Sequence, residues 1–413
     1  MKQSHRRQIP TLSELNDRPP LQLQLAASNR IGCPVIGMMR THETRRARQG
    51  RSMKRQKVDR PGRTLFVLSL EHLFVIKNIE NAVESYCSVT KLPNECMGML
   101  ELESKIFLVG GQKYDRWGWG PPFRDSFSRG IHEVKQHSNS VSIVPSRIMP
   151  KMNEGKLNPI VQKFGSKIFV LHRGPAINLD ELNGGYSTRA FECFDSAFPE
   201  KGWVVKSGVP FLYDAWAYGG HIVHEFHRIG EKLYLTAVNG KGERFYVFDF
   251  KTEEWSKDDC FFVGNHRCMG SPKCVVSAPG LDDDTYVVFG FLNVHSPKFR
   301  AELFTQGKGC SCYQNVHGIF NLKGLGGEDM GCTFVEMGNG DYLGLLTAWE
   351  FKTGDFYLLV STFSLEVLAA RVPPIQSLNE PIKMKFLSIN RKNQQKFKIP
   401  GVDFSYFAGV ACL

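Results

Sequence analysis

The chain has 413 residues, and its 39 glycines and 30 phenylalanines favour turns and strands, which predicts an all-β fold. No stretch reaches 18 uninterrupted apolar residues, which argues against a transmembrane helix. The net charge of +11 lies in residues 1–63, with 15 Lys and Arg against 4 Asp and Glu, whereas residues 64–413 contain 37 of each sign. A neutral body argues against specific nucleic-acid binding by the folded part, because phosphate neutralisation supplies most non-specific affinity.

Residues 1–62 are rich in Arg, Gln, Ser and Pro and show no sustained hydrophobic period. They offer too little apolar surface to offset chain entropy, so we expect a disordered basic tail before a folded body of residues 63–413. Two basic clusters in the tail resemble a bipartite nuclear localisation signal: Arg45, Arg46, Arg48, Lys54, Arg55 and Lys57. A solvated polybasic tail and an organellar transit peptide are the alternatives, although Glu14 and Asp17 count against the transit peptide.

The start of the chain lacks the apolar region of a secretory signal peptide. Eleven cysteines, an odd number spread along the chain, favour a reducing compartment with mostly free, buried thiols. We therefore expect an intracellular protein of the nucleus, the cytoplasm or both, with organellar import as the alternative. A chain that started at Met53 would lose most of the tail and weaken this expectation.

Similar strand openings recur along the body at intervals of 41 to 65 residues. Three of them share a lysine followed by apolar, aromatic and apolar residues. The six openings begin at Thr64, Lys105, Lys167, Lys232, Thr285 and Asp341. Such repetition predicts repeated structural units, each too small to bury its own apolar faces, and six of them fit the available length.

An aromatic, Gly- and Pro-rich loop follows the second of these strands, with the sequence WGWGPPF over residues 117–123. Trp117, Trp119 and Phe123 suit a partner-binding surface, because exposed aromatic rings on loops commonly anchor protein contacts. Alternatively, the same rings fold over the body as a lid.

Three histidines and a glutamate lie close together at His221, His224, Glu225 and His227, and such side chains could ligate zinc. The segment leads directly into the strand at Lys232, where alternation would put Val223 with His221, Glu225 and His227 on one side and His224 on the other. The His-Glu-x-x-His order of zinc proteases is also absent. We expect strand and loop-edge polar residues here, with a metal or ligand site as the alternative.

Lys232–Trp255 is the clearest of the repeated units. Leu233–Val238 is a run of β-formers closed by Asn239-Gly240, a dipeptide that favours a tight hairpin turn. Phe245–Phe250 is apolar on both faces until Asp249, as expected of a strand packed between two neighbouring sheets. A polar turn then leads to Trp255. A four-stranded sheet of this kind implies neighbours.

The same pattern occurs one unit earlier, where Ala190–Asp195 precedes Trp203 as Phe245–Asp249 precedes Trp255. Gly110-Gly111 also follows directly on a strand. A diglycine after one strand, an aromatic second strand, and an Asp turn leading to Trp resemble the kelch repeat, in particular the divergent kelch-like proteins of plants. The resemblance implies a β-propeller of about six four-stranded blades around a central channel.

Other clusters give weaker signals. Cys260, His266, Cys268 and Cys274 form one candidate zinc cluster, and Cys310 and Cys312 form another. Their spacings do not match a structural zinc site, so we expect the cysteines to be buried free thiols rather than ligands. Asp282–Asp284 precedes a strand and predicts a solvated turn. Gly324–Gly327 lacks the Lys-Ser/Thr of a phosphate loop.

Two strand candidates remain near the C-terminus, Met384–Ile389 and Phe404–Cys412. An open ring would leave exposed sheet edges that pair with other chains. We therefore expect one of these strands to complete the unit that begins at Thr64.

No acid, base or nucleophile constellation stands out, so we predict no catalytic residue and no cofactor. The leading hypothesis is a non-enzymatic protein–protein interaction module, a monomer that binds an unknown protein partner through its loops and does not bind membranes. The first alternative is a small-molecule or metal-dependent enzyme at the propeller mouth, with His221, His224 and Glu225 contributing. The second is a ubiquitin-ligase substrate adaptor, against which residues 1–63 show no helical adaptor box.

Overall fold

A computed structural model defines the fold, and it describes fourteen segments of the chain. All of them belong to one compact unit, Asp59–Leu413. The described residues are 63–79, 85–113, 127–137, 140–173, 189–206, 222–239, 242–257, 270–293, 298–306, 309–326, 332–338, 340–372, 382–399 and 409–413.

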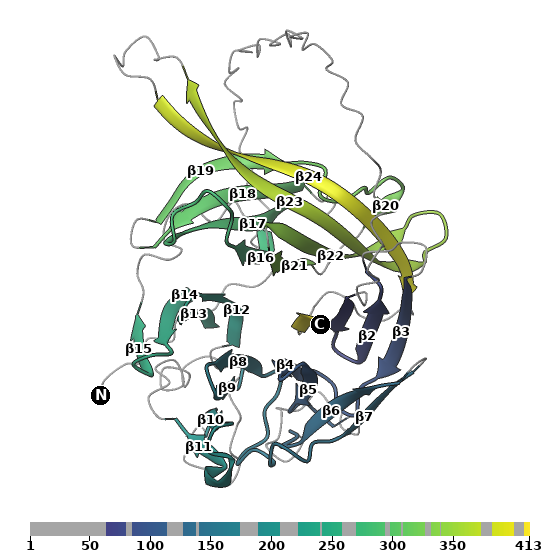
Figure 1. The fold of residues 1–413 in the computed structure, drawn as a ribbon, viewed down its shortest axis with the longest axis vertical. Coiled ribbons are helices and arrows are strands. Elements are labelled where there is room, and N and C mark those ends of the chain that lie inside the picture. Colours follow the sequence, from purple (N-terminus) through teal and green to yellow (C-terminus); the bar gives the residue numbers. More distant parts are fainter. Residues whose placement is uncertain are drawn as a thin grey trace, which may run out of the picture. The chain divides into compact units, whose positions relative to one another are not determined.

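The described residues form an all-β structure of six antiparallel sheets, as the sequence predicts (Figure 1). Blade 1 contains β25 (Gly409–Cys412), β1 (Thr64–Leu68), β2 (His72–Lys77) and β3 (Tyr86–Lys91). Blade 2 contains β4 (Gly98–Leu102), β5 (Lys105–Val109), β6 (Ile131–Gln136) and β7 (Val141–Pro145). Blade 3 contains β8 (Ile160–Phe164), β9 (Lys167–Leu171), β10 (Phe191–Asp195) and β11 (Trp203–Val205).

The second half of the ring follows the same plan, with one addition in the last blade. Blade 4 contains β12 (Ile222–Ile229), β13 (Lys232–Asn239), β14 (Gly242–Asp249) and β15 (Glu254–Lys257). Blade 5 contains β16 (Gly270–Val276), β17 (Thr285–Asn293), β18 (Lys298–Thr305) and β19 (Gly309–Val316). Blade 6 contains β21 (Cys332–Gly338), β22 (Asp341–Glu350), β23 (Phe356–Val372) and β24 (Ile382–Ile399), and the short β20 (Leu325–Gly326) also pairs with β22. The six openings predicted from sequence are thus the second strand of each blade.

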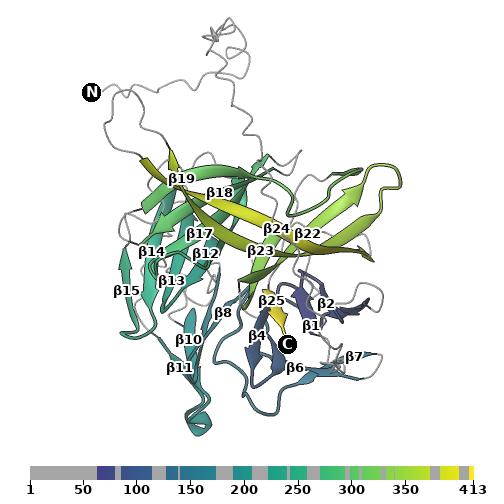
Figure 2. The ribbon, with the colours of Figure 1, turned by 45° about the horizontal axis from the view of Figure 1, so that its top comes forward.

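The sheets form a closed six-bladed β-propeller. The first strands of successive blades lie next to one another, β25 beside β4, β4 beside β8, β12 beside β16, β16 beside β21 and β21 beside β25. The C-terminal strand β25 pairs with β1 near the start of the body, with Leu65 opposite Cys412 (Figure 2). This confirms that a C-terminal strand completes the blade begun at Thr64, and it removes the edges that an open ring would expose.

Apolar residues on both faces of each blade fasten it to its neighbours. In β1, Leu65 and Val67 belong to the cluster shared with blade 6, whereas Phe66 and Leu68 belong to the cluster shared with blade 2. One such buried cluster lies at each of the six junctions between adjacent blades. Near-continuous apolar runs in the sequence follow from this double burial.

The predicted hairpin of blade 4 is confirmed, because β13 pairs with β14 from Lys232 opposite Asp249 to Asn239 opposite Gly242. Trp203 and Trp255, which mark the repeat in the sequence, also occupy equivalent positions in the strand pairing. Trp203 lies opposite Phe194, and Trp255 lies opposite Phe248. Among the described residues, no helix is long and apolar enough to span a membrane.

Candidate functional site

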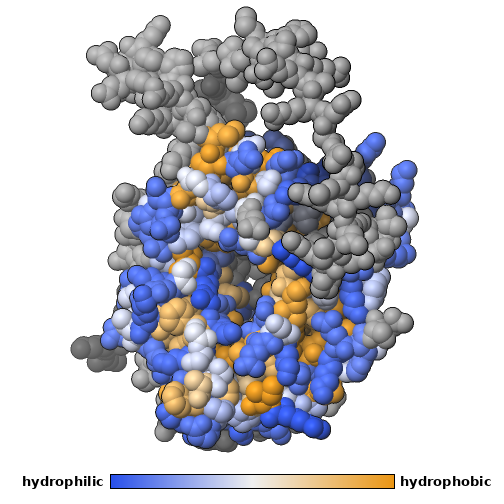
Figure 3. Space-filling view, viewed as in Figure 1, coloured by the Kyte–Doolittle hydropathy of each residue, from blue (hydrophilic) through white to orange (hydrophobic). Residues whose placement is uncertain are grey.

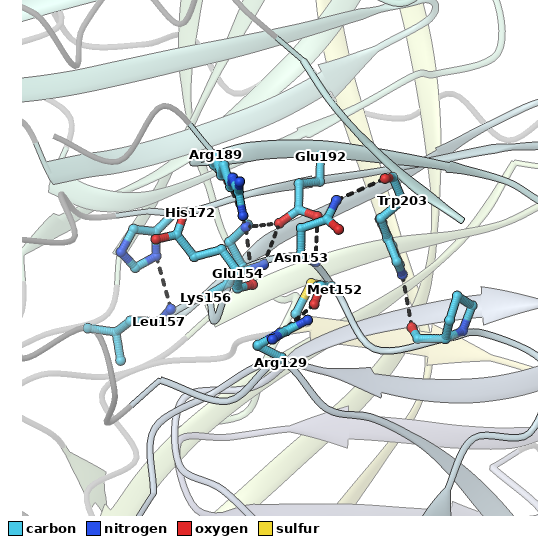
Figure 4. A network of polar contacts seen from close by, with 11 residues as sticks. Arg129, Met152, Asn153, Glu154, Lys156, Leu157, His172, Arg189, Glu192 and Trp203 are labelled. Carbon is cyan, nitrogen blue, oxygen red and sulfur yellow. Dashed lines mark hydrogen bonds and ion pairs between the residues drawn. The ribbon is translucent and has the colours of Figure 1, made fainter. Parts of the chain in front are cut away.

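A buried polar network lies at the junction of blades 2 and 3 (Figure 4). Glu192 stands in β10 between Phe191 and Cys193, which pack toward blade 4. Strand alternation therefore turns the Glu192 carboxylate to the opposite face, under the connection between β7 and β8. It accepts hydrogen bonds from the backbone N–H of Asn153 at 2.8 Å and of Glu154 at 3.1 Å.

Lys156, on the same connection, supplies the positive charge. Its ammonium group forms an ion pair with Glu192 and donates to the carbonyl oxygens of Glu154 at 3.2 Å and Arg189 at 2.8 Å. Both side chains of the pair are fully buried. The three N–H groups of the ammonium thus have three acceptors, which is the condition for burying a charge at tolerable cost.

Three further side chains hold the connection on either side of the ion pair. Arg129 donates from Nε to the carbonyl oxygen of Met152 at 2.6 Å, and Asn153 donates from Nδ2 to that of Trp203 at 2.8 Å. The Trp203 indole donates in turn to the carbonyl oxygen of Pro150 at 2.9 Å. The tryptophan that marks the repeat in the sequence therefore also fixes the inter-blade connection.

His172 ends the network beside Lys156. Its Nδ1 accepts a hydrogen bond from the backbone N–H of Leu157 at 2.9 Å, and its ring packs against Phe127 with centroids 5.3 Å apart. Burial, together with the positive charge of Lys156, lowers the pKa of His172 to about 3. The imidazole is therefore neutral at physiological pH, and because Nδ1 accepts a hydrogen bond, its proton lies on Nε2.

Two glycines let the backbone approach this network closely. Gly110 and Gly111 both have positive φ, +69° and +93°. A Cβ at Gly110 would lie 2.7 Å from the Lys156 carbonyl oxygen, and one at Gly111 would lie 2.5 Å from that of Glu95. The diglycine noted in the sequence is thus required both for its conformation and for space.

The backbone of Lys156 fixes both ends of the segment that joins β5 to β6. Gly111 N–H donates to the Lys156 carbonyl oxygen at 2.8 Å, and Lys156 N–H donates to that of Ser128 at 3.2 Å. Ser128 N–H closes the set by donating to Gly111 at 2.7 Å, and Gln112 forms a bridge with Phe127. Lys156, Glu192 and His172 are buried, and the backbone hydrogen bonds of Lys156 hold Gly111 and Ser128 at the two ends of this segment.

The histidine cluster predicted from sequence is only partly described. His224, Glu225 and His227 lie in β12, where His227 is half-buried, and His221 lies outside the described residues. The register shifts between Val223 and Glu225, so the uninterrupted alternation expected across these positions is wrong. An extra residue in one strand of an antiparallel pair produces such a shift. Within the part of the chain that the structure describes, no group of three or more His, Cys, Asp and Glu could hold a metal ion.

Other predicted positions are placed as follows. The six basic residues of the tail, the loop residues Trp117, Trp119 and Phe123, and Cys260, His266 and Cys268 lie outside the described residues. Cys274 lies in β16, and Cys310 and Cys312 lie in β19. Asp282–Asp284 forms the expected turn, in which Thr285 N–H donates to the Asp282 carbonyl oxygen at 2.9 Å. Gly324 precedes β20 with a φ of +76° and no helix follows it in the described residues.

Sequence reasoning missed the Lys156–Glu192 pair. The available signal was Glu192 itself, an acidic residue inside the apolar strand Phe191–Asp195. A carboxylate in a strand buried on both faces requires a partner, and a cation from a neighbouring connection can supply it. Lys156 carries no comparable signal, because a lysine in a loop is ordinarily solvated.

Comparisons with known proteins assign no family to this chain. No family model matches the sequence, and no curated protein matches it. Among solved structures, it is similar to the structure of YjhT, with 12% identity, 74% of this chain and 98% of that chain covered, and a TM-score of 0.39. It is also similar to a chain of the nidogen/laminin complex, with 10% identity, 72% and 89% covered, and a TM-score of 0.34. A functionally unknown protein from Desulfotomaculum acetoxidans shares 9% identity, with 73% and 92% covered and a TM-score of 0.34.

Proposed function

We propose that this β-propeller is a non-enzymatic interaction module of the kelch type, which binds a protein partner through the segment between β5 and β6. The proposal rests on the backbone hydrogen bonds that hold Gly111 and Ser128, at the two ends of that segment, in place. Both ends are hydrogen-bonded to the backbone of Lys156, and the buried ion pair with Glu192 holds Lys156 in place. Loops that present binding residues from a rigid scaffold are the usual arrangement for recognition.

The residues of the segment supply the chemistry of recognition. Trp117, Trp119 and Phe123 lie within thirteen consecutive residues between the described positions 113 and 127. Aromatic rings bury a large area at low conformational cost, so tryptophan is over-represented among the residues that dominate binding energy. Lys156 and Glu192 are paired with each other, which favours a supporting role for this ion pair over a chemical one.

Details of the repeat support the kelch type. Asp195 accepts a hydrogen bond from Ala197 N–H at 3.0 Å, and Asp249 accepts one from Lys251 N–H at 2.8 Å. Each aspartate therefore caps the turn that leads to the tryptophan of the next strand. The diglycine at Gly110-Gly111, the aromatic strands β10 and β14 and these turns are the three marks of the repeat, although they occur in different blades.

The test compares proteins captured by the full chain, by the triple variant W117A/W119A/F123A and by the control variant F198A/V204A. Phe198 and Val204 are 50% and 47% exposed in blade 3, so the control removes apolar surface elsewhere. We expect quantitative mass spectrometry to show a partner whose recovery falls about tenfold or more with the triple variant alone. Direct binding of that purified partner must reproduce the loss.

Equal recovery with all three chains would contradict the proposal. So would stoichiometric zinc or copper in the purified full chain that is lost on His224→Ala, because the histidine cluster would then be a metal site. Recovery of ubiquitin-ligase core subunits with every variant would favour the adaptor hypothesis instead.

A further inference from the structure

The outermost strand of blade 6 spans three blades. β24 is 18 residues long, and besides its partner β23 it contacts β19 of blade 5 and β3 of blade 1. In Figure 1 it runs from beside β3 to beside β19. A strand of about five or six residues, the usual length, stays within its own sheet. The length of β24 therefore needs an explanation.

The C-terminal half of β24 faces blade 1. Ile399 is buried in the cluster that blades 6 and 1 share, and Phe397 packs against it. Gln395 is also buried, and its side chain donates from Nε2 to the Ile79 carbonyl oxygen at 2.9 Å, where the chain has just left β2. These three side chains alternate along the strand, as one face of a pleat requires. This half of β24 is therefore fastened to blade 1.

The N-terminal half of β24 faces blade 5 instead. Leu387 is buried in the cluster that blades 5 and 6 share, and Ile389 packs against it. The side-chain amide of Gln314, in β19, donates to the Leu387 carbonyl oxygen and accepts from its N–H, both at 2.9 Å. The Gln394 amide forms a similar pair with Asn321, after β19, accepting from its N–H at 2.6 Å and donating to its carbonyl oxygen at 3.1 Å.

A β-bulge lets this one strand face both neighbours. The register shifts between Thr362 and Phe363 of β23, and Lys392 of β24 is the extra residue. Side chains alternate with a period of two, so one extra residue moves the odd-numbered positions of β24 from the face toward blade 1 to the face toward blade 5. The length and the bulge of β24 are explained together if the strand holds two blades.

The strand that closes the ring is short by comparison. β25 has four residues, of which Ala411 is buried but small, and Val410 and Cys412 are half-buried. As the first strand of blade 1, it lies on the inner side of the ring, where Figure 1 marks the C-terminus and the space-filling view shows a hollow (Figure 3). Burial of so little apolar surface stabilises a strand weakly, and short terminal strands open at low free energy.

We propose that β24 is a second fastening of the ring, which keeps blades 5, 6 and 1 together when β25 leaves β1. The hydrogen bond from Gln395 to Ile79 and the packing of Ile399 hold blade 1 independently of the pairing between β25 and β1. The C-terminal strand therefore opens and closes as a local event, while the rest of the propeller stays folded. This inference does not rest on the proposed function.

The test compares amide hydrogen exchange in the full chain and in variants that release each fastening. Ala411→Pro removes an N–H from the pairing of β25 with β1, and Gln395→Leu/Ile399→Ala removes the hold of β24 on blade 1. With Ala411→Pro alone, exchange in β1 should accelerate about tenfold or more, whereas exchange in β2 and β22, on the two sides of the junction between blades 1 and 6, should change less than about threefold. With both changes, β2 and β22 should exchange about tenfold or more faster than the product of the separate effects, because the ring then has neither fastening.

Lys396→Ala/Lys398→Ala is the matched control, since both lysines lie on the exposed face of the same strand and form surface ion pairs with Glu350 and Asp355. Combined with Ala411→Pro, it should leave exchange in β2 and β22 as in Ala411→Pro alone. If Ala411→Pro accelerates β2 and β22 as much as β1, or prevents folding, the proposal is overturned, because β25 is then the sole fastening. Combined effects no larger than the product of the separate ones would overturn it too.

Discussion

A buried ion pair adds to the apolar contacts between blades 2 and 3, whereas packed aromatic rings add to those between blades 5 and 6. At the first, a buried ion pair and hydrogen bonds to backbone hold the connection of residues 146–159. At the second, Phe334 packs against Phe289 with centroids 4.9 Å apart and against Phe363 at 5.6 Å. Both junctions also bury aliphatic side chains, so they differ in the ion pair at the first and the aromatic contacts at the second.

The two junctions use different contacts because one holds only two sheets together, whereas the other also fixes the backbone of a connection. Apolar packing is non-directional and suits two sheets that need only stay together. Hydrogen bonds to a buried charge are directional, and they fix the backbone of Lys156 and thereby both ends of the segment from Gly111 to Ser128. The directional contacts thus occur at the junction that must hold both ends of the long connection between β5 and β6.

Lys156→Met should give the largest effect on the charged junction. It leaves the Glu192 carboxylate buried without its cation, which costs about 3–5 kcal/mol of folding free energy. Chemical denaturation measures the loss. The double variant Lys156→Met/Glu192→Gln should recover part of it, because no unpaired charge remains.

Lys398→Met is the control for this prediction, since its partner Asp355 forms an ion pair at 2.9 Å on the surface. Its denaturation midpoint should stay close to that of the wild type. If Lys156→Met behaved like Lys398→Met, the charged junction would not have the role assigned to it.

Acid should weaken the charged junction through His172. Its pKa is about 3 in the folded chain, against the ordinary histidine value of 6.5 expected once the chain unfolds, so between these values the unfolded chain binds the extra proton. The contribution of His172 to the free energy of unfolding is complete above its pKa in the unfolded chain. It falls as pH decreases, by about 1 kcal/mol per pH unit between pH 6 and 4. Stability curves of the wild type and of His172→Gln measure the difference.

The His172→Gln variant should show the shallower acid slope, and parallel slopes would contradict the burial of a neutral imidazole. Comparison of slopes is needed because other groups titrate as well. The pKa of Glu253 is lowered, for example, with Lys167 and Lys206 as hydrogen-bond partners that outweigh its burial.

Gln314→Leu should give a smaller effect at the apolar junction. It removes both hydrogen bonds to the backbone of Leu387 and costs about 1–3 kcal/mol. Amide exchange at Leu387 should accelerate in the variant, whereas Gln136→Leu, an exposed position in β6, should leave it unchanged. Unaltered exchange at Leu387 would show that β24 is held against β19 by apolar contacts alone.

The ring was predictable from the sequence because local signals repeat. Lys105, Lys167 and Lys232 each open a second strand, and Trp203 and Trp255 occupy equivalent register positions. Double burial of each strand leaves an apolar run that is visible without any structure. The pairing of the C-terminal strand with β1 followed from the need to close sheet edges.

The long strands β23 and β24 and the buried ion pair were not predictable from the sequence, for different reasons. Phe356–Val372 is about three times the usual strand length, and only part of β24 was expected, as the short strand Met384–Ile389. Lys156 lies on the connection between blades 2 and 3, 36 residues before Glu192 in blade 3, and no periodic pattern links a loop lysine to a strand glutamate. Such contacts depend on the tertiary arrangement.

Closure of the ring by β25 is the central claim, and amide hydrogen exchange in β1 tests it most directly. Thr64 and Leu413 exchange hydrogen bonds at 2.8 and 2.9 Å, so alternation predicts the next bonded pair at Phe66 and Ala411. Ala411→Pro removes the N–H of that pair, whereas Ala411→Ser keeps it. We expect Phe66 and Thr64 to be as protected as the core in the wild type and in Ala411→Ser, and to exchange much faster in Ala411→Pro. Equal exchange in all three chains would show that β25 does not close the ring.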